Sequence, residues 1–335
     1  MGRYTEAHAK PQGVGDARPT ALQIIKDEGV ENKLTGKVIV ITGASSGIGV
    51  ETARALATTG ATLYLTVRDK VKAEENLKDI LGNGRTFLID MDLSSFASVK
   101  AAASAILQKS GNKVNILVNN AGILGIQTRT LSEDGHELHF ATNHLAHFLL
   151  FQLLKTALLA SSTPEFSSRV VNLSSSASRA SKLLPSDNYN FEKSDYDFNI
   201  AYASSKLANV YMASEIERRY GHLGLHATAV HPGGIHTGIG RHVDPKFVEA
   251  IYADEKLLKW LKNPEQGAAT TVWAAVGKEW EGKGGKYLED CSESEEGPDD
   301  SDMFGTGYVP QTYNEAEEER LWKDSVKMVG LEDDA

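Results

Sequence analysis

The sequence of 335 residues contains a single cysteine, Cys291. One cysteine cannot form an internal disulfide, so we expect a protein of a reducing compartment. Cys291 stands among acidic residues, and nearby negative charge raises the pKa of a thiol. We therefore expect Cys291 to be a poor nucleophile with no catalytic role.

An excess of basic charge and long apolar runs are also missing. The chain has 35 Lys and Arg against 45 Asp and Glu, a formal net charge of −10. Binding to nucleic acid or to an anionic membrane surface requires basic clusters, so the charge disfavours both. The best apolar stretch, residues 148–160, is interrupted by Gln152 and Lys155. Since the N-terminus has no signal-peptide pattern, we expect a cytoplasmic protein without an integral membrane segment.

The most informative stretch is residues 37–49, Lys-Val-Ile-Val-Ile-Thr-Gly-Ala-Ser-Ser-Gly-Ile-Gly. Its β-branched residues 38–42 predict a strand that is buried on both faces of a parallel sheet. Glycines follow at positions 43, 47 and 49, and residues 50–57 are helix-prone. A strand, a glycine-rich turn and a helix N-terminus together form a binding site for a diphosphate.

The same stretch contains an alternative motif. Residues 43–47 match G-x-S-x-G, the nucleophile elbow of α/β hydrolases, in which Ser45 would be the nucleophile. That elbow normally follows several strands that carry an oxyanion loop. Residues 1–37, which precede the strand that leads to Ser45, lack strand signals, so we favour nucleotide binding over hydrolysis.

The rest of the chain alternates strands and helices, which predicts a doubly wound parallel sheet (a Rossmann fold) in a single α/β domain. We expect residues 1–34 to form an N-terminal arm, residues 35–290 the dinucleotide-binding and catalytic domain, and residues 291–335 an acidic C-terminal extension with a short helix. The further strands are expected at 61–67, 86–90, 115–118, 169–173, 225–230 and 286–288, and the further helices at 21–27, 69–81, 134–160, 201–220, 264–276 and 314–329. Ser94 and Ser95 are N-cap candidates for one more helix, which extends to Gln108.

Ligands of such a sheet bind at the carboxyl ends of the strands. Tyr202 and Lys206 are four residues apart, on one face of a predicted helix. An ammonium about 4 Å from a phenolate contributes roughly 4 kcal/mol at an effective dielectric near 20, which would lower the tyrosine pKa from about 10 toward 7. Such a tyrosine can exchange a proton with an alcohol or a carbonyl. Ser175, at the end of a strand, could hydrogen-bond the same substrate oxygen.

Five motifs, in order, resemble the short-chain dehydrogenase/reductase family: residues 42–49, the Asn-Asn-Ala-Gly of 119–122, Ser175, Tyr202-x-x-x-Lys206, and Pro-Gly at 232–233. The likeness covers roughly residues 36–290. It implies an oxidoreductase in which Tyr202 is the general acid/base and Ser175, chosen over its serine neighbours by this alignment, orients the substrate. It also implies that Lys206 binds the nicotinamide ribose and lowers the tyrosine pKa, and that Asn143 joins a proton relay. The cofactor residues it implies, besides Tyr202 and Lys206, are Gly43, Ser45, Ser46, Gly47, Ile48, Gly49, Arg68, Asp92, Leu93, Asn119, Ala121, Gly122, Pro232, Gly233, Ile235 and Thr237.

The residue after the second strand indicates which nicotinamide cofactor binds. An acid at this place would bind the ribose hydroxyls of NAD, whereas an arginine pairs with the 2′-phosphate of NADP. The chain has Arg68 there, followed by Asp69. We therefore predict NADP(H), with Asp92 and Leu93 near the adenine.

The substrate class follows from resemblance alone. The stretches Asn-His-Leu-x-His-Phe-Leu-Leu and Ser-Lys-Leu-Ala-Asn, with a polar insert at 179–199, resemble the retinol dehydrogenase and WW-domain oxidoreductase branch. This implies a small hydrophobic carbonyl or alcohol, partly enclosed by residues 235–262. Family members often pair through the helices expected at 134–160 and 201–220, which implies a homodimer or tetramer.

Two further alternatives concern the site. His136, His139, His144 and His147 recur on one predicted helix, but they spread around it without carboxylate or cysteine partners, so we expect packing or surface roles and no metal. A nucleotide-binding interaction module that kept the fold and lost catalysis would share all the motifs except an intact catalytic set. The presence of Tyr202, Lys206 and Ser175 favours the enzyme.

Overall fold

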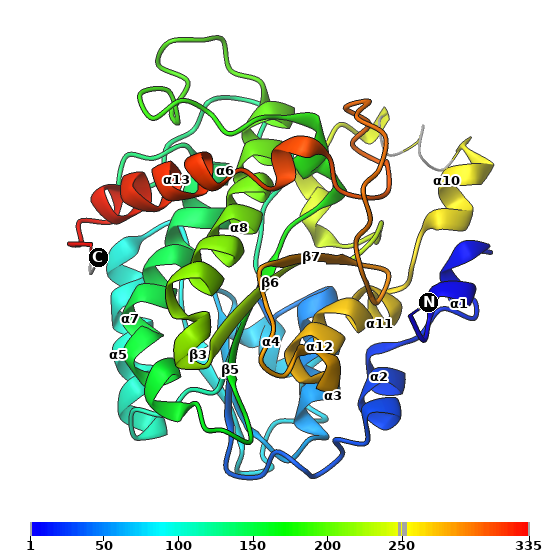
Figure 1. The fold of residues 1–335 in the computed structure, drawn as a ribbon, viewed down its shortest axis with the longest axis vertical. Coiled ribbons are helices and arrows are strands. Elements are labelled where there is room, and N and C mark those ends of the chain that lie inside the picture. The colour runs from blue at the N-terminus through cyan, green and yellow to red at the C-terminus, as the bar shows by residue number, and fades with distance from the viewer. Residues whose placement is uncertain (1, 247–248, 250–252, 334–335) are drawn as a thin grey trace.

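In the described part of the chain, eight strands form one sheet (Figure 1). The computed structural model describes residues 2–246, 249 and 253–333. In chain order the strands are β1 (Val38–Thr42), β2 (Thr62–Val67), β3 (Thr86–Asp90), β4 (Ile116–Asn119), β5 (Ser168–Leu173), β6 (Leu225–His231), β7 (Lys286–Glu289) and β8 (Ser292–Glu293). Across the sheet they run in the order β3-β2-β1-β4-β5-β6-β7-β8, and every pair is parallel except β7 with β8.

Helices cover both faces of this sheet. One face carries α2 (Ala21–Glu28), α3 (Ile48–Ala57), α4 (Lys70–Asn76) and α12 (Ala269–Val276), and the other carries α5 (Phe96–Ser110), α7 (Ala146–Ser161) and α8 (Phe198–Tyr220). Along β1, Val38 and Val40 point into one core cluster while Ile39 and Ile41 point into the other. This alternation explains why the strand needs apolar side chains on both faces, and the doubly wound fold is confirmed.

Further helices and helical turns lie between these elements or near the ends of the chain. They are α1 (Thr5–Ala9), α6 (Leu138–Phe140), α10 (Glu255–Trp260), α11 (Pro264–Gly267), α13 (Glu315–Met328), the π-helical η1 (Ala141–Leu145), and the 3₁₀ turns η2 (Ser176–Ala180), η3 (Gly221–Leu223), η4 (Gly238–His242), η5 (Lys278–Trp280) and η6 (Pro310–Thr312). The segment expected at 235–262 contains positions 247–248 and 250–252, which lie outside the described residues.

Several expected helix bounds were wrong. The helix expected at 69–81 ends at Asn76, and the one expected at 264–276 divides into α11 and α12. The helix expected from residue 134 begins at Leu138, because Gly135 has a φ of 83° and the Glu137 side chain caps the first turn by accepting from Phe140 N. The strands were predicted to within one residue, apart from β8, which the sequence analysis did not anticipate.

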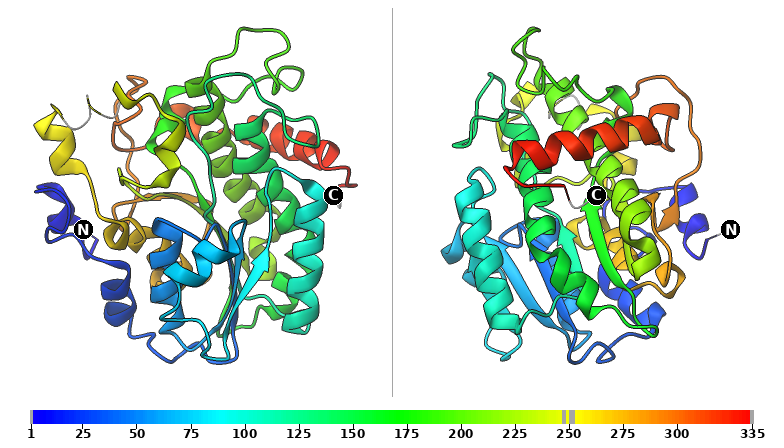
Figure 2. Two further views of the ribbon diagram at one scale, coloured as in Figure 1. Left: turned by 180° about the vertical axis from the view of Figure 1, so that it is seen from behind. Right: turned by 60° about the vertical axis from the view of Figure 1, so that its left-hand side comes forward.

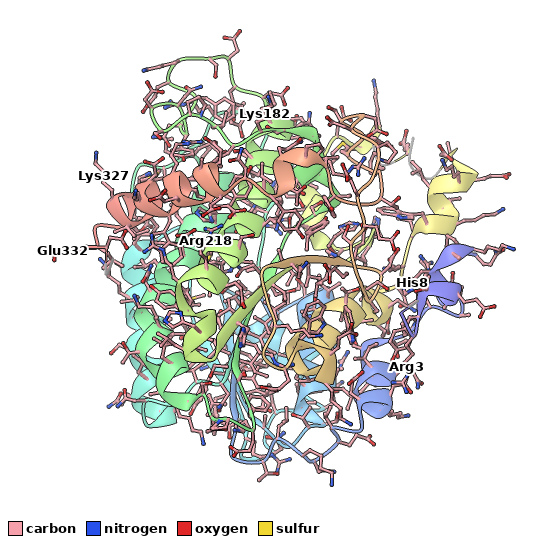
Figure 3. All side chains as sticks on the ribbon, in the orientation of Figure 1. Arg3, His8, Lys182, Arg218, Lys327 and Glu332 are labelled. Atoms are coloured by element: carbon pink, nitrogen blue, oxygen red, sulfur yellow. The ribbon has the colours of Figure 1, made fainter. Side chains whose placement is uncertain are left out.

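The N-terminal residues lie against the edge of the domain where α12 and the segment after β6 meet. Helix α2 packs on α12 and α3. Arg18 is buried and donates to the carbonyl oxygens of Trp260 and Leu261 at 2.8 and 2.6 Å. On α1, His8 lies 3.7 Å from the Asp290 carboxylate (Figure 3). These contacts attach the arm to the segment that follows β6.

The C-terminal helix α13 crosses α8, and Figure 2 shows it running over the helices of that face. Its Trp322 is 1% exposed, and its ring centroid lies 4.9 Å from that of Phe148 on α7. Arg218 points from α8 toward α13, where it pairs with Glu318 (Figure 3). The two helices expected to pair with a second chain therefore carry α13 of their own chain on this face.

The acidic segment 289–302 is exposed to solvent and also attached to the domain. Its side chains are mostly exposed, but it contains β8 and its backbone is anchored. Arg179, 1% exposed, donates to the carbonyl oxygens of Pro298, Thr306 and Gly307 at 2.6 to 2.7 Å. A guanidinium has five donors, so one buried side chain can hold several loop carbonyls at once.

The helical stretch Leu138–Ser161 has a mean hydropathy of 1.2 over its best window and is, by length and composition alone, apolar enough to cross a membrane. About 61% of that window is buried inside the protein, where α7 packs against α5. Within it, His139, His144 and His147 are buried, and each has a polar side-chain partner: Glu137, Ser325 and Thr42 respectively. Its apolar composition is accounted for by packing in the core.

Candidate active site

A cavity of about 390 Å³ lies at the carboxyl ends of β1, β4, β5 and β6, on the two sides of the point where the strand order reverses. Ligands of doubly wound sheets bind at this point. Most of the residues expected from the sequence line it: Gly43, Ser45, Ser46, Gly47, Ile48, Gly49, Arg68, Asp92, Leu93, Ala121, Gly122, Ser175, Tyr202, Lys206, Pro232, Gly233, Ile235 and Thr237.

The turn between β1 and α3 is packed so closely that it excludes side chains. A Cβ at Gly43 would lie 2.8 Å from the Cα of Ala121, and a Cβ at Gly49 would lie 2.3 Å from the Gly43 carbonyl oxygen. Gly47 has a φ of 62°, a left-handed conformation that favours glycine. Among the residues that the structure describes, no side chain caps the first turn of α3, so its backbone N–H groups remain at the wall of the cavity.

Asn119 does not line this cavity. Its side chain is 1% exposed and donates to Oδ1 of Asn172 at 2.8 Å. Asn120 lines the cavity instead and donates to the Thr42 carbonyl oxygen at 2.8 Å. Both asparagines belong to one motif, and only the side-chain directions at the end of β4 decide which of them faces a ligand.

Charged side chains surround the end of the cavity beside β2 and β3. Arg68 is exposed there. The neighbouring Asp69 is the N-cap of α4 and accepts from Lys72 N at 3.0 Å, so its carboxylate is already used. Asp92 accepts from the backbone N–H of Ser94 at 2.9 Å and so shapes the turn after β3. Arg68 is therefore the charged group available to a ligand at the end of β2.

Tyr202, Ser175 and Lys206 line the other end of the cavity. Tyr202 and Lys206 extend from α8, while Ser175 follows β5. The Lys206 ammonium donates to the Leu173 carbonyl oxygen at 3.1 Å and lies 5.7 Å from the centroid of the tyrosine ring. The i, i+4 spacing on one helix brings the phenol and the ammonium to the same face, as the sequence predicts.

The expected fall in the pKa of Tyr202 was wrong for this structure. Burial raises the pKa of Tyr202 to about 12, and its hydrogen bond with Ser175 opposes that rise. Burial also lowers the pKa of Lys206 to about 8. Removal from water disfavours the charged form of each group, and burial is the largest cause of both shifts. Tyr202 therefore carries its proton at neutral pH.

Asn143 lies behind the cavity wall on η1, and π-helical turns occur often at functional sites. Its side-chain oxygen accepts from Ile123 N at 2.8 Å, and its amide donates to the Ser205 hydroxyl at 2.9 Å. Its carbonyl oxygen accepts from the side chains of His147 and Asn209, each at 3.0 Å. A Cβ at Gly122 would lie 3.3 Å from both Asn143 Oδ1 and Lys206 Nζ, so this glycine permits their close approach.

A buried histidine connects this asparagine to the glycine-rich turn. His147 Nε2 lies 2.9 Å from the Thr42 hydroxyl, which in turn accepts from the backbone N–H groups of Asn120 and Ala121. Burial lowers the pKa of His147 to about 4, so the imidazole is neutral at pH 7. The sequence analysis assigned this histidine only a packing role and did not anticipate the connection.

The segment after β6 closes the cavity from the side of α12. Thr237 packs against Gly47, where a Cβ would lie 3.2 Å from it. Gly233 has a φ of 102° and lies over the buried side chain of Lys262, which pairs with Asp290 at 2.6 Å. Residues of the cavity wall that the sequence analysis missed are Thr66, Met91, Ser94, Asn120, Ile123, Ile126, Leu138, Thr142, Leu173, Ser174, His231, Gly238, Ile239, Arg241 and His242.

The arrangement fits a nicotinamide dinucleotide. The glycine-rich turn and the N-terminus of α3 present backbone N–H donors to a diphosphate. Arg68, at the end of β2, presents a cation to the same ligand. At the far end, a phenol, a hydroxyl and an ammonium converge on one part of the wall. This is a donor set for an oxygen atom that gains or loses a proton.

Comparison with known proteins agrees with this geometry. Residues 37–246 match the family model described as short chain dehydrogenase. The chain is 47% identical to the short-chain dehydrogenase/reductase prx1 of Penicillium rubens over 98% of its length and 96% of that protein. It is 35% identical to human retinol dehydrogenase 13, covering 89% of this chain and 86% of the relative.

A solved structure agrees as well. The NADP active-site complex of RhlG from Pseudomonas aeruginosa superposes with a TM-score of 0.61 at 26% identity, over 76% of this chain and 95% of that one. The nucleotide-binding turn, the convergent donors and these likenesses lead to one conclusion: the chain belongs to the short-chain dehydrogenase/reductase family, whose members are oxidoreductases with a nicotinamide cofactor.

Proposed function

We propose that this protein is an NADP(H)-dependent oxidoreductase that interconverts a hydrophobic carbonyl compound and its alcohol. The observation that carries the proposal is the meeting of Tyr202, Ser175 and Lys206 at one end of a cavity whose other end is the glycine-rich turn. A dinucleotide bound along this cavity would bring a substrate oxygen within reach of the tyrosine.

Tyr202 is assigned as the general acid for carbonyl reduction. Its pKa, raised to about 12 by burial, keeps the hydroxyl protonated at neutral pH, which is the form an acid needs. Ser175 lines the same end of the cavity and is placed to donate to the substrate oxygen as Tyr202 transfers its proton. A nicotinamide cofactor, when bound, would supply the hydride for the carbonyl carbon. The proton from Tyr202 then completes the alcohol and leaves a phenolate.

Lys206 and Asn143 support this transfer. The Lys206 ammonium stabilises the phenolate by charge attraction and, with its donors, can hold a ribose hydroxyl. Asn143, hydrogen-bonded to Ile123 and Ser205, keeps the polar network beside Lys206 in place. A proton returning to Tyr202 would pass along this network. In the direction of alcohol oxidation, Tyr202 would act as the base and its pKa would have to fall.

The preference for NADP(H) rests on Arg68. Its guanidinium is exposed at the end of β2, while the adjacent Asp69 carboxylate caps α4 and is not directed at the ligand. An arginine without a competing acid favours a 2′-phosphate. We expect Arg68→Ala to raise the KM for NADPH about tenfold or more, the value of a charge-assisted hydrogen bond, and to leave the KM for NADH unchanged. Equal KM values before and after the substitution would refute the assignment.

The substrate class is proposed from the wall and from the relatives. Ile123, Ile126, Leu138 and Ile239 form an apolar part of the cavity near Tyr202. Related proteins are named retinol dehydrogenases, which supports an apolar alcohol or carbonyl as the substrate of this chain. We extend the proposal to a cytoplasmic protein, consistent with the burial of the apolar stretch Leu138–Ser161 in the core.

The decisive experiment measures NADPH consumption at 340 nm with apolar aldehydes, ketones and quinones, for the native protein and for Tyr202→Phe. We expect the substitution to lower turnover by at least about 10²-fold, the usual contribution of a positioned acid. Equal turnover would refute the mechanism. The alternative, a nucleotide-binding interaction module without catalysis, predicts NADPH binding with no turnover on any of these compounds and no effect of Tyr202→Phe.

A further inference from the structure

A buried carboxylate and a buried histidine lie beside Tyr202 and take no part in the mechanism above. Glu137 and His139 are both 0% exposed, and Glu137 Oε1 lies 2.9 Å from His139 Nδ1. The other carboxylate oxygen accepts from Phe140 N at 2.8 Å. A buried carboxylate is stable only where hydrogen bonds from the protein replace those from water, and the contacts of this pair meet that requirement.

The hydrogen bonds define the protonation of the imidazole. His139 Nε2 accepts from the backbone N–H of Ile126 at 3.4 Å, so this nitrogen carries no proton. Nδ1 therefore carries it and donates to Glu137. A second proton on Nε2 would face the Ile126 N–H, donor against donor. The pair is thus an imidazole whose orientation is fixed by a carboxylate.

Residues of the polar insert contact the Ile126 carbonyl group and Glu137. The Tyr196 hydroxyl lies 2.9 Å from the Ile126 carbonyl oxygen and 3.2 Å from Glu137 Oε1. The backbone N–H of Glu137 donates to Asn190 Oδ1 at 2.8 Å. Tyr196 and Asn190 belong to the polar insert 179–199, so this insert and the start of α6 together fix both polar groups of Ile126.

The hydrogen-bonded group of Glu137, His139, Tyr196 and Ile126 contacts the reaction site at two places. Ile126 and Leu138, which is flanked by Glu137 and His139 in the chain, line the cavity. The His139 ring meets the Tyr202 ring edge to face, with centroids 6.3 Å apart and planes at 73°. A displacement of the imidazole would therefore move an apolar wall of the cavity and remove a contact of the general acid.

We propose that Glu137 and His139 are positioning residues that, with Tyr196 of the insert, fix the apolar wall at Ile126 and thereby set the size of substrate the site accepts. The effect on substrate size rests on the proposed function. The positioning of the Ile126 peptide by these residues does not. The polar insert accordingly has a role in substrate selection, exerted through Tyr196 and Asn190.

The test uses two isosteric replacements of His139. The amide nitrogen of His139→Asn can take the place of Nδ1 and donate to Glu137, but the contact with the Ile126 N–H is lost. The amide oxygen of His139→Gln can take the place of Nε2 and retain that contact. Each variant, with Tyr196→Phe as a second route to the same peptide and His136→Asn as a matched control, is assayed for kcat/KM with hexanal and decanal. His136 packs against Phe96, outside the network.

We expect His139→Asn and Tyr196→Phe to change the ratio of kcat/KM for the two aldehydes by about tenfold, the lower range for altered fit in an apolar pocket, with the KM for NADPH unchanged. His139→Gln should restore most of the native ratio. Loss of folded protein alone would lower both kcat/KM values equally and leave the ratio as it was, so a purely structural role predicts no change.

Amide hydrogen exchange of Ile126 is measured on the same proteins and needs no turnover. We expect faster exchange in His139→Asn, and near-native exchange in His139→Gln and His136→Asn. If the native protein reduces neither aldehyde, aldehydes of this kind are not its substrates. The hydrogen exchange of Ile126 then tests by itself whether His139 positions this peptide. The inference is overturned if His139→Asn leaves both the aldehyde ratio and the Ile126 exchange at the values of His136→Asn.

Discussion

Replacing Lys206 with methionine is expected to stabilise the free protein while it removes turnover. Burial lowers the pKa of Lys206 from its ordinary 10.5 to about 8, because the ammonium loses its water on entering the interior. A lysine with a depressed pKa binds its proton more weakly in the folded than in the unfolded chain. The charge therefore opposes folding below pH 8, and this cost is relieved as the pH rises toward 10.5.

The size of the effect follows from the two pKa values. A difference of about 2.5 units corresponds to roughly 3 kcal/mol at pH 7, and linkage reduces the cost to about 1 kcal/mol at pH 10. Methionine has a similar length and no charge, but it loses the hydrogen bond to the Leu173 carbonyl oxygen, worth about 1 kcal/mol. At pH 7 the variant should thus be more stable than the native protein by about 2 kcal/mol.

The assay is urea unfolding of both proteins from pH 7 to pH 10. Taking the difference between them cancels the titration of every other group, and we expect the advantage of Lys206→Met to fall by about 2 kcal/mol over this range. A difference that does not depend on pH would refute the reasoning, because it would mean that Lys206 has the same pKa in the folded and unfolded chains. Catalytic centres often contain a charged group that destabilises the folded protein.

Other predictions concern packing, reactivity and acid stability. Trp322→Ala should lower the free energy of unfolding by about 3 to 5 kcal/mol, since the indole is 1% exposed against α7 and α8; a loss below 1 kcal/mol in urea unfolding would contradict this packing. Cys291 is 2% exposed and burial raises its pKa to about 12, so Ellman's reagent at pH 8 should react with it only after unfolding in urea, and reaction at the rate of a free thiol would contradict its burial. Burial lowers the pKa of His144 and His231 to about 3 and that of His147 to about 4, so the unfolded chain binds more protons between pH 6.5 and 4. Stability should then fall with decreasing pH by up to about 4 kcal/mol per unit, and an acid slope unaffected by His144→Gln would argue against this origin.

Local patterns in the sequence were sufficient for much of the fold. The β-branched run 38–42 and the glycines after it determine a buried strand and a tight turn by local sterics, so β1 and the start of α3 could be predicted almost to the residue. Tyr202 and Lys206 share a helix face because of the helical repeat. Strand β8, only two residues long, has no such local pattern, since it exists through its pairing with β7.

Other features depend on contacts between distant segments. Which of Asn119 and Asn120 faces the cavity depends on the neighbouring strand β5, where Asn172 binds the first. The pKa of Tyr202 depends on how deeply α8 is buried, which no spacing of residues reveals, so the sequence argument predicted the wrong direction. Cys291 is a poor nucleophile as expected, but chiefly because of burial rather than acidic neighbours.

The sequence by itself therefore determined the alternation of strands and helices from β1 to β7, the glycine-rich turn and the spacing of the catalytic pair, because these follow from backbone geometry over a few residues. Only the tertiary structure decided the desolvation of Tyr202 and Lys206, the burial of Glu137 with His139, and the placement of α13 over α7 and α8. Electrostatics and burial depend on everything within several ångströms of a group, and those neighbours come from chain segments far apart in sequence.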